Sequence, residues 1–149
     1  MEQEDKELLQ KDILHRLDNF TLLVRYGEGN FNLLGIAYGR VILVKPFMSV
    51  TAGSPLVEEV KPYLRPMSSM TLDEKKELAS MIDIGLMNGI DVSNINYSIE
   101  WEFPWDYVSF KLDYEDLIKF IDWLDMKNFD HRGLIEKGLA LPAEEGMYN

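Results

Sequence analysis

Two runs of strand-forming residues and the turn between them set the fold class of this chain: Phe20-Thr21-Leu22-Leu23-Val24-Arg25-Tyr26, then Gly27-Glu28-Gly29-Asn30, then Gly35-Ile36-Ala37-Tyr38-Gly39-Arg40-Val41-Ile42-Leu43-Val44-Lys45. Val, Ile, Leu and Tyr dominate both runs, and the glycine-rich segment between them is typical of a hairpin turn. Gly39-Arg40 can divide the second run into two strands. The pattern predicts strands of an antiparallel sheet.

Three other segments repeat apolar residues at the spacing of a helix. Residues 5–18 form the first, and its lone His15 falls off the apolar stripe, so we expect His15 in solvent. The second runs from a capping box of Thr71 and Glu74 to about residue 88. Asp113 can cap the third. The expected stripes of the first and third are Leu8, Leu9, Ile13, Leu14 and Leu17, and Tyr114, Leu117, Ile118, Ile121 and Leu124, with Phe120 and Trp123 widening the latter.

The remaining segments are predicted from their turn residues and their alternation. Residues 47–55 indicate a surface loop, and Pro62 and Pro66 favour a short edge piece with a rigid connector, because proline cannot donate to a central ladder. Residues 96–112 alternate apolar and polar side chains around a short turn, which predicts a hairpin. Asp130 can start a short helix that ends at a left-handed Gly138.

Together these elements predict an α+β fold in one domain, residues 1–149. Three main helices would pack on a small antiparallel sheet, which could close partly into a barrel. A chain of 149 residues with 46% hydrophobic content can bury one core and is short for two ordinary domains.

The compartment is predicted from cysteine use and apolar runs. The chain has no cysteine, and its first residues are acidic where a secretory signal would be basic and then apolar. The longest apolar run, residues 33–44, is shorter than the roughly 18 residues of a spanning helix. We therefore expect a cytoplasmic protein without a membrane segment.

Net charge restricts the partners. The chain carries a formal charge of −11, and residues 91–130 alone hold 10 acidic and 3 basic residues. Such a segment repels phosphate backbones, so direct nucleic-acid binding is not expected. One hypothesis is that the acidic surface imitates nucleic acid and inhibits a host enzyme; the alternative is that it only keeps the domain in solution.

Patterns of known catalytic sites are absent from the sequence. Gly27-Glu28-Gly29-Asn30-Phe31-Asn32 lacks the third glycine of a dinucleotide fingerprint, and neither a phosphate-binding loop nor a nucleophile elbow occurs. Ser68 or Ser69 with His131 would be needed for a serine hydrolase, which we keep as a third hypothesis. We expect no enzyme activity, no cofactor and no metal site.

Aromatic residues on an acidic turn favour binding over catalysis. Trp101, Trp105 and Tyr107 lie within seven residues, and Trp105 falls in the turn where a core position is hardest to arrange. Exposed aromatic side chains are frequent anchors of protein contacts. The alternative is that Trp105 folds back over the edge of the domain.

Two motifs carry a resemblance to a known family. They are Val60-Lys61-Pro62-Tyr63-Leu64-Arg65-Pro66-Met67-Ser68-Ser69-Met70-Thr71, with the helix start that follows it, and Phe129-Asp130-His131-Arg132-Gly133-Leu134-Ile135-Glu136-Lys137-Gly138-Leu139-Ala140-Leu141 with Glu145-Gly146-Met147-Tyr148. Below, residues 60–71 are the proline motif and residues 129–148 the terminal motif. Together with a weaker match at residues 8–13, they cover somewhat under half of the chain.

The two motifs resemble those of a family of small Bacteroides and Bacteroides-phage proteins of unknown function. The resemblance implies membership of that family and no activity. In this chain Pro142-Ala143-Glu144 departs from the family's acidic and proline segment.

The two motifs could also form one site. Arg65 and His131 are polar residues in rigid, apolar settings, and Met67 and Met70 offer adaptable contact surface. Either Arg65 joins an acidic partner such as Asp130 in a structural network, or the residues bind a partner. Our leading hypothesis is a small interaction or regulatory protein of phage or mobile-element origin. Its partner is a protein, bound through Trp101, Trp105, Tyr107, Arg65 and His131, and the sequence does not indicate an oligomeric state.

Overall fold

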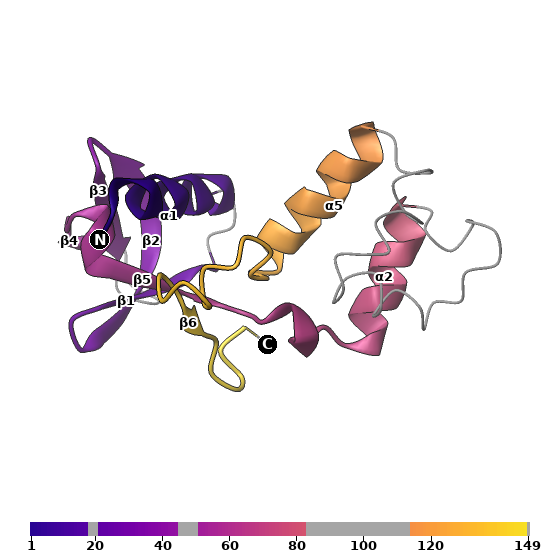
Figure 1. The fold of residues 1–149 in the computed structure, drawn as a ribbon. Coiled ribbons are helices and arrows are strands. Elements are labelled where there is room, and N and C mark those ends of the chain that lie inside the picture. Colours follow the sequence, from indigo (N-terminus) through magenta and orange to yellow (C-terminus); the bar gives the residue numbers. More distant parts are fainter. Residues whose placement is uncertain (18–20, 45–50, 83–113, 149) are drawn as a thin grey trace.

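The structure is a computed structural model that describes residues 1–17, 21–44, 51–82 and 114–148. Within these ranges it contains helices α1 (Gln3–Arg16), α2 (Leu72–Ile82) and α5 (Tyr114–Met126), as drawn in Figure 1. The strands are β1 (Leu23–Tyr26), β2 (Gly29–Ala37), β3 (Arg40–Val44), β4 (Thr51–Gly53), β5 (Val60–Leu64) and β6 (Leu141–Pro142). Short 3-10 turns, Val57–Glu59 and Met67–Ser69, flank β5. The predicted α+β class is confirmed.

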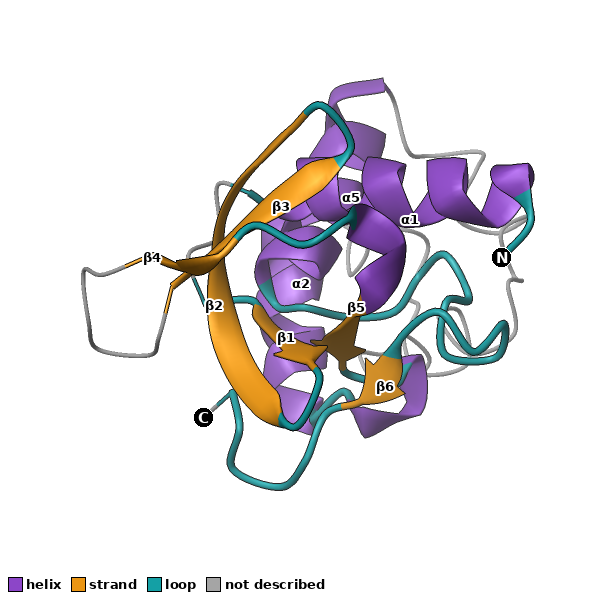
Figure 2. Cartoon of the chain, turned by 90° about the vertical axis from the view of Figure 1, so that its left-hand side faces the viewer, coloured by secondary structure: helices purple, strands orange, loops and turns teal. Residues whose placement is uncertain are grey.

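The described strands form one open, mixed sheet. Their order is β4-β3-β2-β1-β5-β6, and every pairing is antiparallel except that of β5 with β6. The order ends at β4 on one side and β6 on the other, so the described strands do not form the partial barrel that the sequence left as one possibility. Figure 2 shows β2 and β3 as the long, curved part of the sheet.

Both predicted hairpin turns occur, the second one residue earlier than expected, because Arg40 already belongs to β3. Gly27, with φ of 60°, begins the turn between β1 and β2, and Tyr26 pairs with Gly29 across it. Tyr38 and Gly39 both have positive φ, 53° and 71°, and form the two-residue turn between β2 and β3. Positive φ at both positions gives the twist that a tight hairpin requires.

The main core lies between one face of the sheet, α1 and the terminal motif, and Figure 1 shows α1 lying along the sheet. Burial alternates along β3, where Val41 and Leu43 point inward and Ile42 points outward. Buried residues of this cluster are Leu9, Ile13, Leu22, Val24, Leu33, Val41, Leu43, Val57, Val60, Leu64, Leu134, Leu139 and Ala140. The terminal motif is therefore part of the core and not an appended tail.

The buried face of α1 differs from the predicted stripe. Leu14 is 47% exposed, whereas Leu9, Asp12, Ile13 and Arg16 are fully buried. Those four residues have helical i, i+3, i+4, i+7 spacing, but two of them are charged. The predicted stripe contained Leu14 because it was drawn through apolar residues only, which left out the charged residues Asp12 and Arg16. His15 is exposed, as predicted.

The expectation that residues 56–66 only border the sheet is wrong, because β5 lies between β1 and β6. Val24 pairs with Pro62, and register explains why proline fits. The two-residue turn makes Tyr26 and Gly29 a hydrogen-bonded pair. Hydrogen-bonded pairs alternate along an antiparallel ladder, so the backbone N–H and C=O of Val24, two residues earlier, also point toward β2. Pro62 therefore faces β1 in a non-hydrogen-bonded pair, so the N–H that proline lacks would not have bonded to β1. Pairing with β6 starts one residue later, at Tyr63.

The hydroxyl of Tyr148 replaces a backbone hydrogen bond where β1 and β5 separate. The backbone N–H of Leu23 donates to Tyr148 Oη at 2.9 Å, and Tyr148 Oη donates to the carbonyl of Tyr63 at 2.7 Å. In a continued ladder these two groups would bind each other. The last residues of the terminal motif are therefore built into the sheet.

Local signals at the ends of elements are mostly confirmed. Glu74 N–H donates to Thr71 Oγ1 at 3.2 Å and Thr71 N–H to Glu74 Oε1 at 3.1 Å, which is the predicted capping box. Gly138 is left-handed, with φ of 75°, but residues 134–138 form a turn and not the expected helix. Asp130 caps that turn.

Three other expectations are only partly met. The expected loop at residues 47–55 contains β4, and residues 45–50 lie outside the described part. In α5, Phe120, Trp123 and Leu124 are buried as predicted, whereas Ile118 is 40% exposed. The predicted hairpin at residues 96–112 and the end of the second predicted helix lie outside the described residues.

We predict that Tyr148→Phe lowers the free energy of unfolding by about 1–3 kcal/mol, because the Leu23 N–H and the Tyr63 carbonyl lose their shared partner. Urea unfolding measures this change. Tyr26→Phe, which removes an exposed hydroxyl from β1, is the matched control and should leave stability unchanged.

The stabilising effect of the Tyr148 hydroxyl, measured against Tyr148→Phe, should also depend on pH in the alkaline range. Burial raises the pKa of Tyr148 from 10.0 to about 12. The folded state holds the phenolic proton of Tyr148 more tightly than the unfolded state does. The contribution of the hydroxyl to stability is therefore complete below pH 10 and is lost as pH rises through 12. The stability difference between the native chain and Tyr148→Phe should therefore shrink over that interval. A constant difference would show that the hydroxyl is not buried.

Candidate functional site

The proline motif and the terminal motif meet along a short stretch of parallel backbone. Arg65 N–H donates to the carbonyl of Asn128 at 2.7 Å, and Asp130 N–H donates to the carbonyl of Arg65 at 2.8 Å. On the same strand, Tyr63 and Leu64 pair with Leu141 and Pro142. The hypothesis that the two motifs lie together is therefore confirmed in space. We call this place the motif junction.

The side chain of Arg65 binds Glu74 and not the expected Asp130. Arg65 donates from Nη1 to Glu74 Oε2 at 2.7 Å and from Nη2 to Glu74 Oε1 at 2.6 Å. Its guanidinium lies 4.2 Å from the ring centroid of Phe129. Asp130 instead accepts the backbone N–H groups of Leu134 and Ile135 at 2.8 and 2.9 Å. Arg65 thus joins β5 to the first turn of α2.

Glu74 is an acceptor for three groups and stays ionised down to low pH. Burial by itself would raise its pKa, but hydrogen bonds from Arg65 and Thr71 and the charge of Arg65 outweigh burial and lower the pKa from 4.5 to about 2. One carboxylate therefore serves both the capping box and the arginine.

The end of α5 is fixed by a left-handed asparagine. Asn128 has φ of 61°, Phe129 N–H donates to the Leu124 carbonyl at 2.9 Å, and Asn128 N–H donates to the Asp125 carbonyl at 3.1 Å. This pair of bonds is a Schellman motif. The ring of Phe129 stacks on Trp123 at 5.8 Å, which is the apolar contact that accompanies such caps.

Arg16 of α1 is buried against this helix end. It donates from Nε and Nη2 to the two carboxylate oxygens of Asp12, at 2.8 and 2.9 Å. Nη2 also donates to the Phe129 carbonyl at 2.7 Å, and Nη1 to the Asp125 carbonyl at 3.5 Å. A cation next to the last carbonyls of a helix is favoured by the helix dipole. Arg16 therefore ties α1 to the end of α5.

Arg132 completes what we call the charge network, made of Asp12, Arg16, Asp125, His131 and Arg132. Its Nη1 donates to Asp12 Oδ1 at 2.7 Å and to Asp125 Oδ1 at 2.9 Å. Burial alone would raise the pKa of Asp125 and lower that of Arg132. The hydrogen bonds that Asp125 receives from His131 and Arg132 lower its pKa, and those that Arg132 makes to the two aspartates raise its pKa.

His131 lies in this network and not beside a nucleophile. Its Nε2 is 2.7 Å from Asp125 Oδ1, and no serine or threonine hydroxyl is among its described contacts. Ser69 Oγ donates to the Pro66 carbonyl at 2.7 Å, as a turn residue does. A histidine held by a carboxylate is one part of a hydrolase site, but the described residues do not supply the rest.

A second feature, which the sequence reading missed, is an exposed face of the β2–β3 hairpin. Leu34 is 53% exposed and Tyr38 is completely exposed, while Ile42 and Val44 are half-buried. Register places Ile42 and Val44 on the side of the sheet away from α1, together with Arg25 and Arg40. We call Leu34, Tyr38, Ile42, Val44 and the two arginines the hairpin face.

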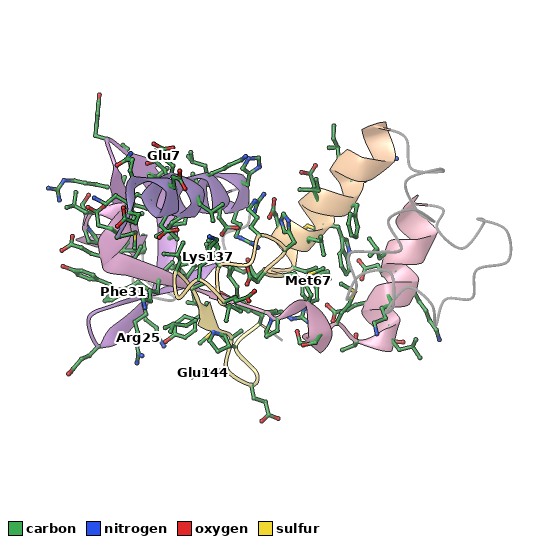
Figure 3. The ribbon with its side chains drawn as sticks, in the orientation of Figure 1. Glu7, Arg25, Phe31, Met67, Lys137 and Glu144 are labelled. Carbon is green, nitrogen blue, oxygen red and sulfur yellow. The ribbon has the colours of Figure 1, made fainter. Side chains whose placement is uncertain are left out.

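The arginines lie at opposite ends of the hairpin face. Arg25 projects from β1 into solvent (Figure 3), and Arg40 donates to the Ser54 carbonyl at 3.0 Å. Two signals in the sequence could have identified this face. Tyr38 occupies a turn position where Asn, Asp or Gly is preferred, and Ile42 and Val44 alternate with the inward Val41 and Leu43.

The expected partner-binding residues are distributed unevenly. Arg65 and His131 belong to the motif junction and the charge network, and Met70, expected as contact surface, is buried. Trp101, Trp105 and Tyr107 lie outside the described residues.

None of the protein families, curated proteins and solved structures compared with this chain matches it. Among the described residues, no helix is long and apolar enough to span a membrane. The same residues contain no cluster of three or more acidic or histidine side chains suited to a metal ion.

We predict that Asp125→Asn lowers the free energy of unfolding by about 3–5 kcal/mol, because Arg16 and Arg132 lose part of their compensation in a buried site. Urea unfolding with circular dichroism measures the loss. Asp122→Asn changes an exposed residue of the same helix and is the control. Similar small effects of both variants would mean that the network does not stabilise the fold.

We also predict that Glu74 contributes to acid sensitivity. Its pKa is lowered on folding, so its stabilising effect is complete above pH 4.5 and is lost as pH falls through 2. Glu74→Gln should be less stable than the native chain at neutral pH, and the difference should vanish toward pH 2. Glu136→Gln, on the exposed terminal turn, should show no such convergence. A pH-independent difference for Glu74→Gln would contradict the ion pair with Arg65.

Proposed function

We propose that this protein is a small interaction protein that acts by contact with another protein and that the hairpin face is its contact surface. The observation that carries the proposal is Tyr38, a bulky aromatic residue that is fully exposed and has φ of 53°. Nothing in the described fold uses this side chain for packing.

Backbone strain supports a binding role for Tyr38. A bulky residue in the left-handed region costs free energy of order 1 kcal/mol, and such strain persists where the surroundings or the function require it. Asparagine or glycine would form the same turn without this cost. An exposed tyrosine presents a large, rigid surface with a hydrogen-bonding end, which suits a contact anchor.

The chemistry of the hairpin face indicates the kind of partner. Ile42 and Val44 are the apolar residues that the register places on this side, exposed Leu34 lies at the irregularity of β2, and Arg25 and Arg40 lie at the two ends. A complementary surface is apolar, offers a recess for Tyr38 and carries carboxylates at its rim. Electrostatic complementarity of this kind favours specific association.

The other hypotheses receive less support from the described residues. An acidic nucleic-acid mimic would use residues 91–130, most of which lie outside the described part, whereas the hairpin face is basic. A hydrolase using His131 lacks a neighbouring hydroxyl among the described contacts. The resemblance to Bacteroides and phage proteins is compatible with a contact-based role and implies no chemistry.

The test uses a variant that keeps the turn and removes the tyrosine. Proteins retained by the native chain are identified from the native host, and each is then purified and titrated separately. Tyr38→Asn should weaken binding of the true partner at least tenfold. It should also raise the melting temperature by about 2–4 °C, because relief of the strained turn stabilises the fold by roughly 1 kcal/mol.

The control is Leu14→Gln, which removes an exposed apolar side chain from α1. It should leave affinity unchanged. If Tyr38→Asn binds every retained protein as tightly as the native chain does, the hairpin face is not the contact surface.

A further inference from the structure

A cavity of about 440 Å³ lies at the motif junction, apart from the hairpin face. Its described lining residues are Thr21, Arg65, Met126, Lys127, Asn128, Met147 and Tyr148. They come from four places in the chain: the start of β1, the end of β5, the end of α5 and the terminal motif. The volume falls within the roughly 300–1,000 Å³ of small-molecule sites.

The charge of the lining is opposite to that of the chain. Two lining residues, Arg65 and Lys127, are cations, and no carboxylate is among the described lining residues, although the chain carries −11 overall. Because the lining holds cations and no carboxylate, an anion meets less repulsion here than beside the acidic residues that dominate the rest of the chain.

The two cations are not equivalent. Arg65 donates two short hydrogen bonds to the carboxylate of Glu74, so most of its charge is already compensated. Lys127 Nζ is 3.7 Å from Glu77 Oε2, and both side chains are a third or more exposed. An exposed ion pair of this length contributes little and is easily exchanged. Lys127 Nζ also lies 5.9 Å from the ring centroid of Trp123, but it is still the more weakly held of the two lining cations and the one that can turn to an incoming anion.

The rest of the lining suits an apolar body. Met126 and Met147 supply flexible thioether side chains, which adapt to ligands of different shape. The hydroxyl of Tyr148 is engaged between Leu23 and Tyr63, so the ring, and not its polar end, is available to a ligand. Asn128 Nδ2 donates to Thr21 Oγ1 at 3.1 Å and gives the cavity one polar side.

We propose that this cavity binds a small amphipathic anion, a carboxylate or a phosphate ester on an apolar chain. Lys127 holds the anionic head, and Met126 and Met147 contact the apolar chain. This site does not depend on the proposed function, because none of its described lining residues belongs to the hairpin face.

The test is a titration of the protein, labelled at its methionine methyl groups, with octanoate, octyl phosphate and octan-1-ol, followed by NMR. Octanoate or octyl phosphate should shift the methyl signals of Met126 and Met147 and bind at least tenfold more tightly than octan-1-ol. The more tightly bound of the two anions shows whether the natural head group is a carboxylate or a phosphate.

Variants separate recognition from folding. Lys127→Gln removes the charge and keeps a polar side chain that is one bond shorter, and it should weaken binding of the anions about tenfold, while Lys137→Gln, on the exposed turn of residues 134–138, should not. Met147→Glu, which brings a carboxylate into the cavity, should abolish anion binding as a second, independent change.

Tyr38→Asn should bind both anions as the native chain does, so failure at one site is distinguishable from failure at the other. Equal binding of octan-1-ol, unchanged affinity in Lys127→Gln, or shifts confined to other methionines would overturn the proposal.

Discussion

The rest of the described structure depends on the guanidinium of Arg16. It is fully buried, it binds both carboxylate oxygens of Asp12, and it caps the carbonyl of Phe129 at the end of α5. A buried cation is tolerated only where its donors are satisfied. The end of α5 must therefore lie against α1, and the terminal motif that follows α5 is brought beside β5. Backbone pairing at Arg65 and the hydroxyl of Tyr148 then join that motif to the sheet.

This arrangement determines which polar side chains are engaged within the fold. The polar side chains of both motifs bind carboxylates of neighbouring helices: Arg65 binds Glu74 of α2, and Arg132 and His131 bind Asp125 of α5. These pairings give the polar residues of both motifs a structural role, so the motifs do not need a catalytic role to account for them. Among the described residues outside this scaffold, the hairpin face, where Tyr38 packs against nothing, and the cavity beside Lys127 are open to solvent.

The sequence predicted features that short-range rules determine. The Gly27 and Gly39 turns and the Thr71 and Glu74 capping box each involve residues close together in the chain, and each is confirmed. Asp130 also acts as a cap, although it starts a turn and not the expected helix. Long-range partners were not predictable. From sequence alone, Arg16 looks like a solvent-exposed helix residue, because its partners Asp125 and Phe129 are 109 and 113 positions away. Pro62 argued against a central strand because its register with β1, which makes the missing N–H harmless, is not visible in the sequence. Tyr38 could have been identified as unusual from turn chemistry alone.

Native-state hydrogen exchange at the motif junction tests the central claim most directly. If the charge network holds the terminal motif in the core, the amides of Arg65 and Asp130 should exchange only by global unfolding. Their free energy of opening should then equal that of the Val24 amide in β1. Exchange of Arg65 and Asp130 through a local opening of much lower free energy, with Val24 still protected, would show that the terminal motif separates from the sheet independently, and would contradict the account.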